Sequence, residues 1–485
     1  MNTFLKLQNV VPRMHESPFK IPVNWEMQEG ETWSIIGKNG SGKTLFAEIL
    51  CGHHNLIQGT IEYPFFEKLK REKPPEETIY PQLKQFVKIV GFKSVYSIVD
   101  FREMYYQQRF NSMETEESPF VSELFNPEMM NKISQMPNID NLMTRRLIQL
   151  SSGELRKLLI AEILLKKLRM IIFDNPFIGL DARSRTQLDE TFNHLSKSNV
   201  QLLFLVPSIN DLPAATSHIM EMDNFRIVRS STKEKFFTKN QTDKFDLNHS
   251  KDIVIDWNLF PKTSEPDYAT VVKMEDIEIS YGNQIIVKDI NWEIKIGEKW
   301  ALLGSNGSGK STLLSYIFAD NPQAYSKKLI LFDRKRGTGE SIWDIKRRIG
   351  FTSSEMHLYY RENVSCLKVV ESGFFDSIGL YRKCTAEQTK TAEYLLTVLE
   401  VKYLKDKSFL RISSGEQRLI LFARSLVKNP ELLILDEPFH GLDDDHKKRC
   451  LQIIKSYCEQ VGKSLIFVTH QQNEIPDNIT RYLKL

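Results

Sequence analysis

Two copies of one glycine-rich motif are the parts of this chain whose residue types and spacing most directly indicate chemistry. The first copy runs from Gly37 to Thr44 and the second from Gly304 to Ser311, 267 positions later, and both fit the pattern Gly-x-x-x-x-Gly-Lys-Ser/Thr. In such a loop the glycines let backbone N–H groups face phosphate oxygens, the lysine reaches the terminal phosphates, and the hydroxyl ligates magnesium. The sequence therefore predicts two sites for a nucleoside triphosphate and Mg²⁺, or descent from a protein that had them.

The elements expected around each motif are a buried strand before it and a helix after it. The apolar runs 33–36 and 300–303 directly precede the two loops, which is typical of buried strands. Thr44 and Ser311 are the hydroxyls expected on magnesium. The residues expected to hold the nucleotide are Gly37, Asn39, Gly40, Ser41, Gly42, Lys43 and Thr44 in the first loop, and Gly304, Asn306, Gly307, Ser308, Gly309, Lys310, Ser311 and Thr312 in the second.

The repeat extends well beyond the two loops. Residues 23–33 return as 290–300 at the same offset, and two shorter motifs further on return 262 positions later. These are a Ser-Ser-Gly-Glu box and an apolar run that ends in aspartate. We therefore predict two homologous units, 1–232 and 269–485, each long enough for its own core and joined by a polar, proline-containing linker at 233–268.

Composition limits the class of protein without identifying it. The formal net charge is only +3, from 65 basic and 62 acidic residues, so no overall field favours nucleic acid. The longest apolar runs have the length of a strand and fall short of the ~18–20 residues of a membrane span. The first residues lack the apolar core of a signal peptide, and the five cysteines form no Cys-x-x-Cys pair. We therefore expect a cytoplasmic protein with no transmembrane segment of its own.

The order of the motifs in each half resembles the ATP-binding cassette (ABC) ATPases. In this family the glycine-rich loop is the Walker A motif, the Ser-Ser-Gly-Glu box is a variant of the signature, and the strand ending in Asp174 or Asp436 is Walker B. A box of small residues at a helix start, taken alone, is more often a plain helix cap. Its position about 20 residues before an apolar strand ending in aspartate, in both halves, favours the cassette interpretation.

The resemblance implies an α/β fold with two tandem P-loop NTPase domains, each with a RecA-like core, a small antiparallel β subdomain and a helical subdomain. It also implies that the two cassettes pair head to tail within one chain, the signature of each closing the ATP site of the other. ATP and Mg²⁺ are the cofactors it implies. The residues assigned on this basis are Ser151, Ser152, Gly153, Glu154, Ser413, Ser414, Gly415 and Glu416 for the signatures, and Thr44, Asp174, Ser311 and Asp436 for magnesium.

The two halves differ where the family places its catalytic groups. Glu437 follows the Walker B aspartate in the second half and could orient and polarise the attacking water. Asn175 stands there in the first half, and its amide cannot take a proton at neutral pH. His470 matches the switch histidine of the family, whereas the aligned first-half residue is Ser208. Glu437 and His470 are therefore the expected catalytic residues.

The asymmetry extends to the position where the family stacks an aromatic ring on adenine. Tyr281 matches that position in the second half, and its first-half counterpart is Met14. Three groups are thus present around the second Walker motifs and absent around the first. We expect one hydrolytic site, formed by the second-half Walker motifs and the first-half signature, and one degenerate site.

The sequence also departs from the family pattern at a position that couples the ATPase to a transporter. Transporters of the family carry a glutamine that contacts both the magnesium site and the membrane subunit, whereas the aligned residues here are Ser354 and Val95. Within the family, the chain is most similar to the ModF-type tandem ATPases, which are associated with molybdate transport and photorepair. The segments that carry this similarity are 324–326, 331–344, 353–358 and 372–381.

Three functional interpretations stay open. The chain could be the ATP-binding component that energises or regulates a transporter formed by separate membrane subunits, at the inner face of the membrane. It could instead be an ATP-driven switch that acts on nucleic acid or another protein. A ribosome-associated double-cassette factor ranks lowest. Its usual long charged hairpin does not fit the predicted linker, and the run after Walker B reads Pro-Phe-His-Gly-Leu-Asp instead of Pro-Thr-Asn-His-Leu-Asp.

Overall fold

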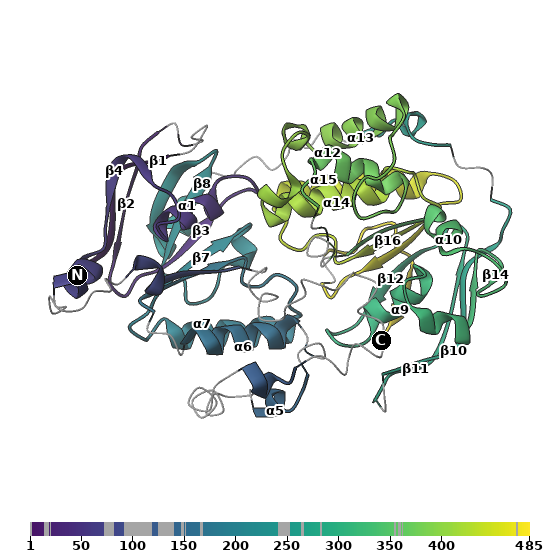
Figure 1. Cartoon of the computed structure of the whole chain (residues 1–485), viewed down its shortest axis with the longest axis horizontal. Helices are drawn as coiled ribbons and strands as arrows, with labels where there is room; N and C mark the ends of the chain where they lie inside the picture. The colour runs from purple at the N-terminus through teal and green to yellow at the C-terminus, as the bar shows by residue number, and fades with distance from the viewer. Residues whose placement is uncertain are drawn as a thin grey trace. The chain divides into compact units, whose positions relative to one another are not determined.

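The computed structural model separates the described residues into two compact units: the first contains those up to Asn240 except Pro119, and the second contains those from Ile253 onward. Figure 1 draws the first unit from purple to teal and the second from teal to yellow. For a few described positions, Tyr281 among them, only the backbone is described. The structure describes every residue except 1, 14–18, 20, 72–81, 92–118, 125–139, 147–149, 151, 165–167, 241–252, 263–265, 282–283, 354–355, 357–359, 361 and 472–473.

A six-stranded sheet forms the centre of the first unit. Its strands are β3 (Thr32–Ile36), β5 (Val87–Gly91), β6 (Met170–Asp174), β7 (Gln201–Val206), β8 (His218–Asp223) and β9 (Arg226–Thr232). They are ordered β5-β6-β7-β3-β8-β9, and all neighbours run parallel except β8 and β9. Every residue of β7 is buried, because a parallel sheet is covered on both faces.

A smaller antiparallel sheet and several helices cover this centre. The small sheet has the order β2-β1-β4, from β1 (Thr3–Pro12), β2 (Val23–Gln28) and β4 (Leu56–Glu62). Its Leu7 and Trp25 share a hydrophobic cluster with Leu205, while Phe204 faces a second cluster with Leu158 on the other side of the central sheet. The helices are α1 (Lys43–Leu50), α2 (Pro64–Arg71), α5 (Asp140–Met143), α6 (Ser152–Leu164), α7 (Ala182–Leu195) and α8 (Lys233–Asn240).

The second unit repeats this plan. Its parallel sheet contains β12 (Lys299–Leu303), β15 (Ile349–Ser353), β16 (Leu432–Asp436), β17 (Ser464–Val468) and β18 (Arg481–Lys484), in the order β15-β16-β17-β12-β18. Its antiparallel sheet has the order β11-β10-β13-β14, from β10 (Thr270–Tyr281), β11 (Gln284–Lys295), β13 (Lys328–Leu331) and β14 (Arg334–Lys335). One continuous hydrophobic cluster connects the two sheets and the helices.

Helices among the described residues of this unit frame the sheet and form a separate helical layer. They are α9 (Lys310–Ile317), α10 (Ile342–Arg348), α12 (Cys366–Glu371), α13 (Ala386–Val398), α14 (Ser414–Leu426) and α15 (Asp444–Glu459). Helix α12 packs against both α13 and α14. The expected α/β class is confirmed: each unit has an antiparallel sheet beside a sheet that is parallel throughout in the second unit and parallel except for β8 and β9 in the first.

Both ends of the predicted linker pack on the unit they adjoin. Phe236 of α8 is buried in the first unit. In the second unit, Trp257 Nε1 donates a hydrogen bond to Ser456 Oγ at 3.0 Å, and Thr391 donates to the carbonyl of Leu259. The boundaries at 232 and 269 stay a prediction. In the described part of the chain, no helix is both long enough and apolar enough to span a bilayer.

Candidate nucleotide sites

The two glycine-rich loops lie where a central parallel strand ends and a helix begins. Gly42 and Gly309 precede α1 and α9 with φ of 100° and 89°, a left-handed conformation that suits glycine. At Gly37 an added Cβ would collide with the backbone carbonyl oxygen of Met222, so this position has no room for a side chain. Both loops therefore present backbone N–H groups at a helix N-terminus, which is the arrangement that binds phosphate.

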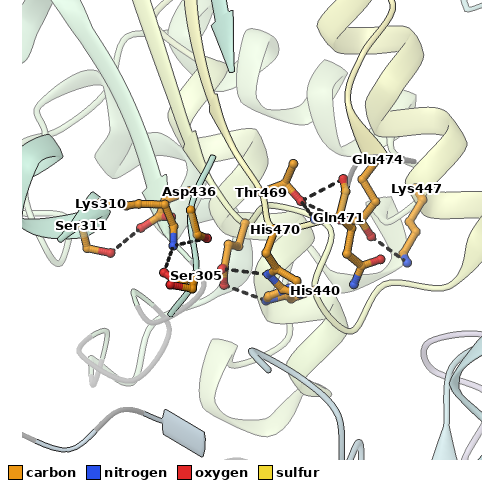
Figure 2. Close-up of polar contacts among 12 residues, drawn as sticks. Ser305, Lys310, Ser311, Asp436, His440, Lys447, Thr469, His470, Gln471 and Glu474 are labelled. Carbon is orange, nitrogen blue, oxygen red and sulfur yellow. Dashed lines mark hydrogen bonds and ion pairs between the residues drawn. The ribbon is translucent and has the colours of Figure 1, made fainter. Parts of the chain in front are cut away.

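The lysine at the end of each loop folds back and bonds to carbonyl oxygens at the start of the same loop. Lys310 Nζ donates to the carbonyl oxygens of Gly304 at 2.9 Å and of Ser305 at 2.7 Å (Figure 2). Lys43 makes the two equivalent bonds at 2.6 and 2.9 Å. Ser308 Oγ is buried and makes no hydrogen bond within the described residues. A cationic group and a buried hydroxyl with spare bonding capacity fit a phosphate group.

The predicted magnesium ligands meet in both units. Ser311 Oγ donates to Asp436 Oδ2 at 3.1 Å, and Thr44 Oγ1 donates to Asp174 Oδ2 at 2.9 Å. Octahedral Mg²⁺ with bonds of ~2.1 Å holds neighbouring oxygen ligands about 3 Å apart, so both pairs fit the ion. Burial raises the pKa of Asp174, and the Thr44 hydroxyl and nearby Lys43 oppose this only in part. A bound cation would favour the ionised carboxylate at this position.

In the second unit, the carboxylate of Glu437 lies between two imidazole rings. Its Oε1 is 3.2 Å from His470 Nδ1, and its Oε2 is 3.0 Å from His440 Nδ1. Figure 2 labels both histidines. Burial alone would raise the pKa of Glu437, but the adjacent His440 and His470 outweigh burial and hold that pKa well below its usual range. The structure thus brings the two expected catalytic residues together and adds His440.

Strand ends and a short loop position this cluster. The N–H of Glu437 donates to the carbonyl of Val468, which ties the end of β16 to the end of β17 at 2.9 Å. After β17, the N–H of Gln471 donates to Thr469 Oγ1 at 3.0 Å. Glu474 then pairs with Lys447 of α15 at 3.2 Å (Figure 2). These bonds fix the loop that carries His470.

The first unit has the same backbone at this point with different side chains. The N–H of Asn175 donates to the carbonyl of Leu205 at 2.9 Å, and its φ of 53° matches the 52° of Glu437. Its Nδ2 donates to Asp174 Oδ1 at 3.2 Å. Ser208 accepts a hydrogen bond from the N–H of Asn210 and so caps a turn. The first unit therefore has no carboxylate–imidazole pair at these aligned positions.

The signature boxes begin helices, as their composition predicts. Ser413 caps α14, and Glu416 reciprocates by accepting from the N–H of Ser413 at 2.8 Å. Glu416 also accepts from the hydroxyl of Tyr403 at 2.8 Å, and Glu154 pairs with Arg145 at 2.7 Å. Both carboxylates are thus engaged inside their own unit. Contact of either box with a nucleotide stays a prediction.

Several predicted positions lie outside the described residues. They are Met14, Val95, Ser151 and Ser354, together with the side chains of Tyr281 and Ser152. Sequence reasoning gave no role to His440. The one local indication of a role is its position three residues after Glu437. This spacing brings the two side chains together only through the turn between β16 and α15, which the sequence alone does not reveal.

Comparison with known proteins identifies the class. A family model described as "ABC transporter" matches residues 21–178 and 287–440, which together are more than half of the chain. The chain therefore belongs to the ABC transporter family of ATP-binding proteins, and it carries two cassettes. The expected pair of P-loop NTPase domains is confirmed.

Individual relatives also span nearly the whole chain. The ABC transporter ATP-binding protein ModF of Escherichia coli is 31% identical over 471 residues, covering 94% of this chain and 92% of the relative. An uncharacterised ABC transporter ATP-binding protein of Schizosaccharomyces pombe is 30% identical, covering 99% and 97%. A chain in a model of ribosome-bound archaeal Pelota and ABCE1 has a TM-score of 0.54 with 19% identity, covering 96% and 74%, and shares the fold.

Proposed function

We propose that this protein is an asymmetric tandem ATPase that binds two ATP molecules with Mg²⁺ and hydrolyses one of them efficiently. The competent site contains Lys310, Ser311, Asp436, Glu437 and His470 of the second unit. The observation that carries this proposal is the carboxylate of Glu437 held 3.2 Å from His470, where the first unit has Asn175 and Ser208.

The side chains divide the work at the competent site. Lys310 and the loop N–H groups hold the phosphates, while Ser311 and Asp436 hold Mg²⁺, which neutralises phosphate charge when it is bound. Glu437 orients and polarises the attacking water. Its lowered pKa keeps it ionised at neutral pH, and the nearby imidazoles fix the direction of its oxygens. Asn175 can hold a water molecule but cannot accept its proton.

The direct test replaces the carboxylate by an amide of the same shape. Glu437→Gln should lower kcat by at least ~100-fold, the usual scale for losing a general base, and leave ATP binding intact. Asn175→Asp is the matched control at the other site and should leave most of the wild-type rate. Turnover that survives in Glu437→Gln would remove Glu437 from the mechanism.

We further propose that the first-unit signature completes the competent site within a monomer. The family resemblance supports this arrangement. Replacing the signature glycine of each unit in turn by valine, and measuring ATP hydrolysis, tests it. Gly153→Val should be as damaging to hydrolysis as loss of Lys310, whereas Gly415→Val should be milder. Equal effects of the two valines, in steady-state rates of folded protein, would contradict the pairing.

Two biological settings fit such an ATPase. We propose first that it is the ATP-binding component of a transport system, working in the cytoplasm at the inner face of a membrane; its ModF relative is named an ABC transporter ATP-binding protein. The alternative is a switch acting on nucleic acid or protein, favoured by Ser354 and Val95 in place of the coupling glutamine. Copurification with the Glu437→Gln protein, scored for membrane subunits against nucleic acid, distinguishes the two.

A further inference from the structure

The second unit gathers three metal-ligating side chains, Glu437, His440 and His470, at the proposed hydrolytic site. One ring nitrogen of His440, one ring nitrogen of His470 and a carboxylate oxygen of Glu437 all lie within 4.8 Å of one another. Across the part of the chain that the structure describes, no other three histidine, cysteine or acidic side chains come this close. The centroids of the two rings are 5.0 Å apart (Figure 2).

The geometry fits a small tetrahedral cation. Zinc binds histidine nitrogen and carboxylate oxygen at ~2.0–2.2 Å, which places neighbouring ligand atoms about 3.4 Å apart. His440 Nδ1 is 3.0 Å from Glu437 Oε2, and His470 Nδ1 is 3.2 Å from Glu437 Oε1, so each ring lies at nearly this distance from one oxygen of the shared carboxylate. Two imidazoles and one carboxylate are also the donor set of known catalytic zinc sites that keep a fourth position open.

His440 supplies the independent observation. It is only 6% exposed, and its Nδ1 makes no hydrogen bond within the described residues, although Glu437 Oε2 is 3.0 Å away. A buried ring nitrogen that lies 3.0 Å from a carboxylate oxygen, outside hydrogen-bond geometry, is arranged as two ligands of a common ion would be. Mg²⁺ is a poor candidate for this ion, because it prefers an all-oxygen octahedron.

The first unit provides an internal contrast. The residues aligned with Glu437, His440 and His470 are Asn175, Ile178 and Ser208, none of which is a zinc ligand of ordinary strength. The donor set is therefore confined to the cassette for which we propose hydrolysis. It involves the very carboxylate that the reaction needs.

We propose that Glu437, His440 and His470 bind a divalent transition-metal ion of the zinc class, and that this ion stops hydrolysis by occupying the Glu437 carboxylate. Metal binding follows from the side chains alone. The inhibition rests on the proposed function, because it requires Glu437 to act on the water. The two parts are therefore measured separately.

Binding is tested with Co²⁺ added to the intact chain without nucleotide, because cobalt reports its ligands by absorption. We expect the visible bands of a low-coordinate nitrogen–oxygen site, without a thiolate charge-transfer band, and their loss on adding Zn²⁺. His440→Gln and Glu437→Gln should each abolish these bands. His194→Gln, an exposed histidine on α7, should keep them. Absent bands, a thiolate band, or bands unchanged in His440→Gln with native thermal unfolding would overturn the site.

Inhibition is tested with Zn²⁺ in saturating Mg²⁺–ATP, each variant being compared with its own zinc-free rate. Wild type should slow by ~100-fold, the factor expected for losing the general base. His440→Gln should keep its zinc-free rate at the same Zn²⁺ concentration. Equal slowing of both proteins would contradict the proposed switch. If wild type hydrolysed no ATP at all, the proposed function would fail, while the cobalt spectrum would still decide whether the metal site exists.

Discussion

At the residue scale, the backbone of Glu437 carries the clearest mark of a functional constraint. Its φ of 52° lies in the left-handed region, which costs most side chains about 1 kcal/mol or more but which asparagine tolerates. Asn175 occupies the same conformation in the first unit with φ of 53°. The backbone conformation at position 437 therefore disfavours glutamate, as expected if its carboxylate has a function there.

This conformation gives a stability prediction. Glu437→Asn and Glu437→Gln both remove the carboxylate, so their difference isolates the backbone preference. We expect Glu437→Asn to be about 1 kcal/mol more stable than Glu437→Gln in chemical denaturation, with neither variant hydrolysing ATP efficiently.

The first unit supplies the control for this comparison. Asn175→Gln places glutamine at φ of 53° and should lose about the same free energy of unfolding. If the asparagine and glutamine variants at position 437 were equally stable, the left-handed backbone would carry no penalty there, and the argument for strain would be wrong.

At the element scale, the end of α14 depends on a buried ion pair. Lys428, just past that helix, donates to both carboxylate oxygens of Asp376 at 2.5 Å and to the carbonyl of Lys346 at 2.6 Å. Burial lowers the pKa of Lys428 to about 8, although Asp376 opposes this shift. The pair therefore couples the packing of the helical layer to pH.

The sign of this dependence follows from proton binding. An unfolded lysine has a pKa near ~10.4, so between pH 8 and 10.4 the unfolded chain binds more protons at Lys428 than the folded chain does. Stability contributed by this group should therefore rise with pH in that window. Relative to Lys428→Met, the free energy of unfolding of wild type should increase by up to about 3 kcal/mol, measured by denaturation at several pH values. A difference that stayed flat would show that Lys428 has an ordinary pKa.

The elements of the site could be predicted from the sequence because their signals are local. Glycine spacing placed the starts of α1 and α9, and apolar runs placed the strands that end at Asp174 and Asp436. The cluster around Glu437 could be predicted only in part. His470 matched a family position, whereas the role of His440 depends on how the turn after β16 directs its ring, which no periodic pattern records.

The buried pair of Lys428 and Asp376 could not be predicted from the sequence either. The two residues are 52 positions apart, and each alone looks like an ordinary surface charge. Only the packing of the helical layer brings them together and excludes water from them. Contacts of this kind depend on tertiary structure, so sequence patterns with helix or strand periods cannot report them.

At the scale of the whole molecule, we infer that two similar cassettes have unequal tasks. Lys43 and Lys310 make equivalent contacts in their own loops, so the loops themselves do not distinguish the units. The inequality begins one residue after each Walker B aspartate, at Asn175 and Glu437. A matched pair of lysine variants therefore tests the claim without disturbing the residues that differ.

Steady-state Mg²⁺–ATP hydrolysis by Lys43→Ala and Lys310→Ala is the measurement that decides between equal and unequal sites. We expect Lys310→Ala to lose at least ~100-fold in kcat, as for removal of a strong phosphate contact, because it disables the site that contains Glu437 and His470. Lys43→Ala should keep a substantial part of the wild-type rate, since the site with Asn175 contributes binding more than turnover. Equal losses in the two variants would mean that both sites hydrolyse ATP or must act together, and would contradict the asymmetric account.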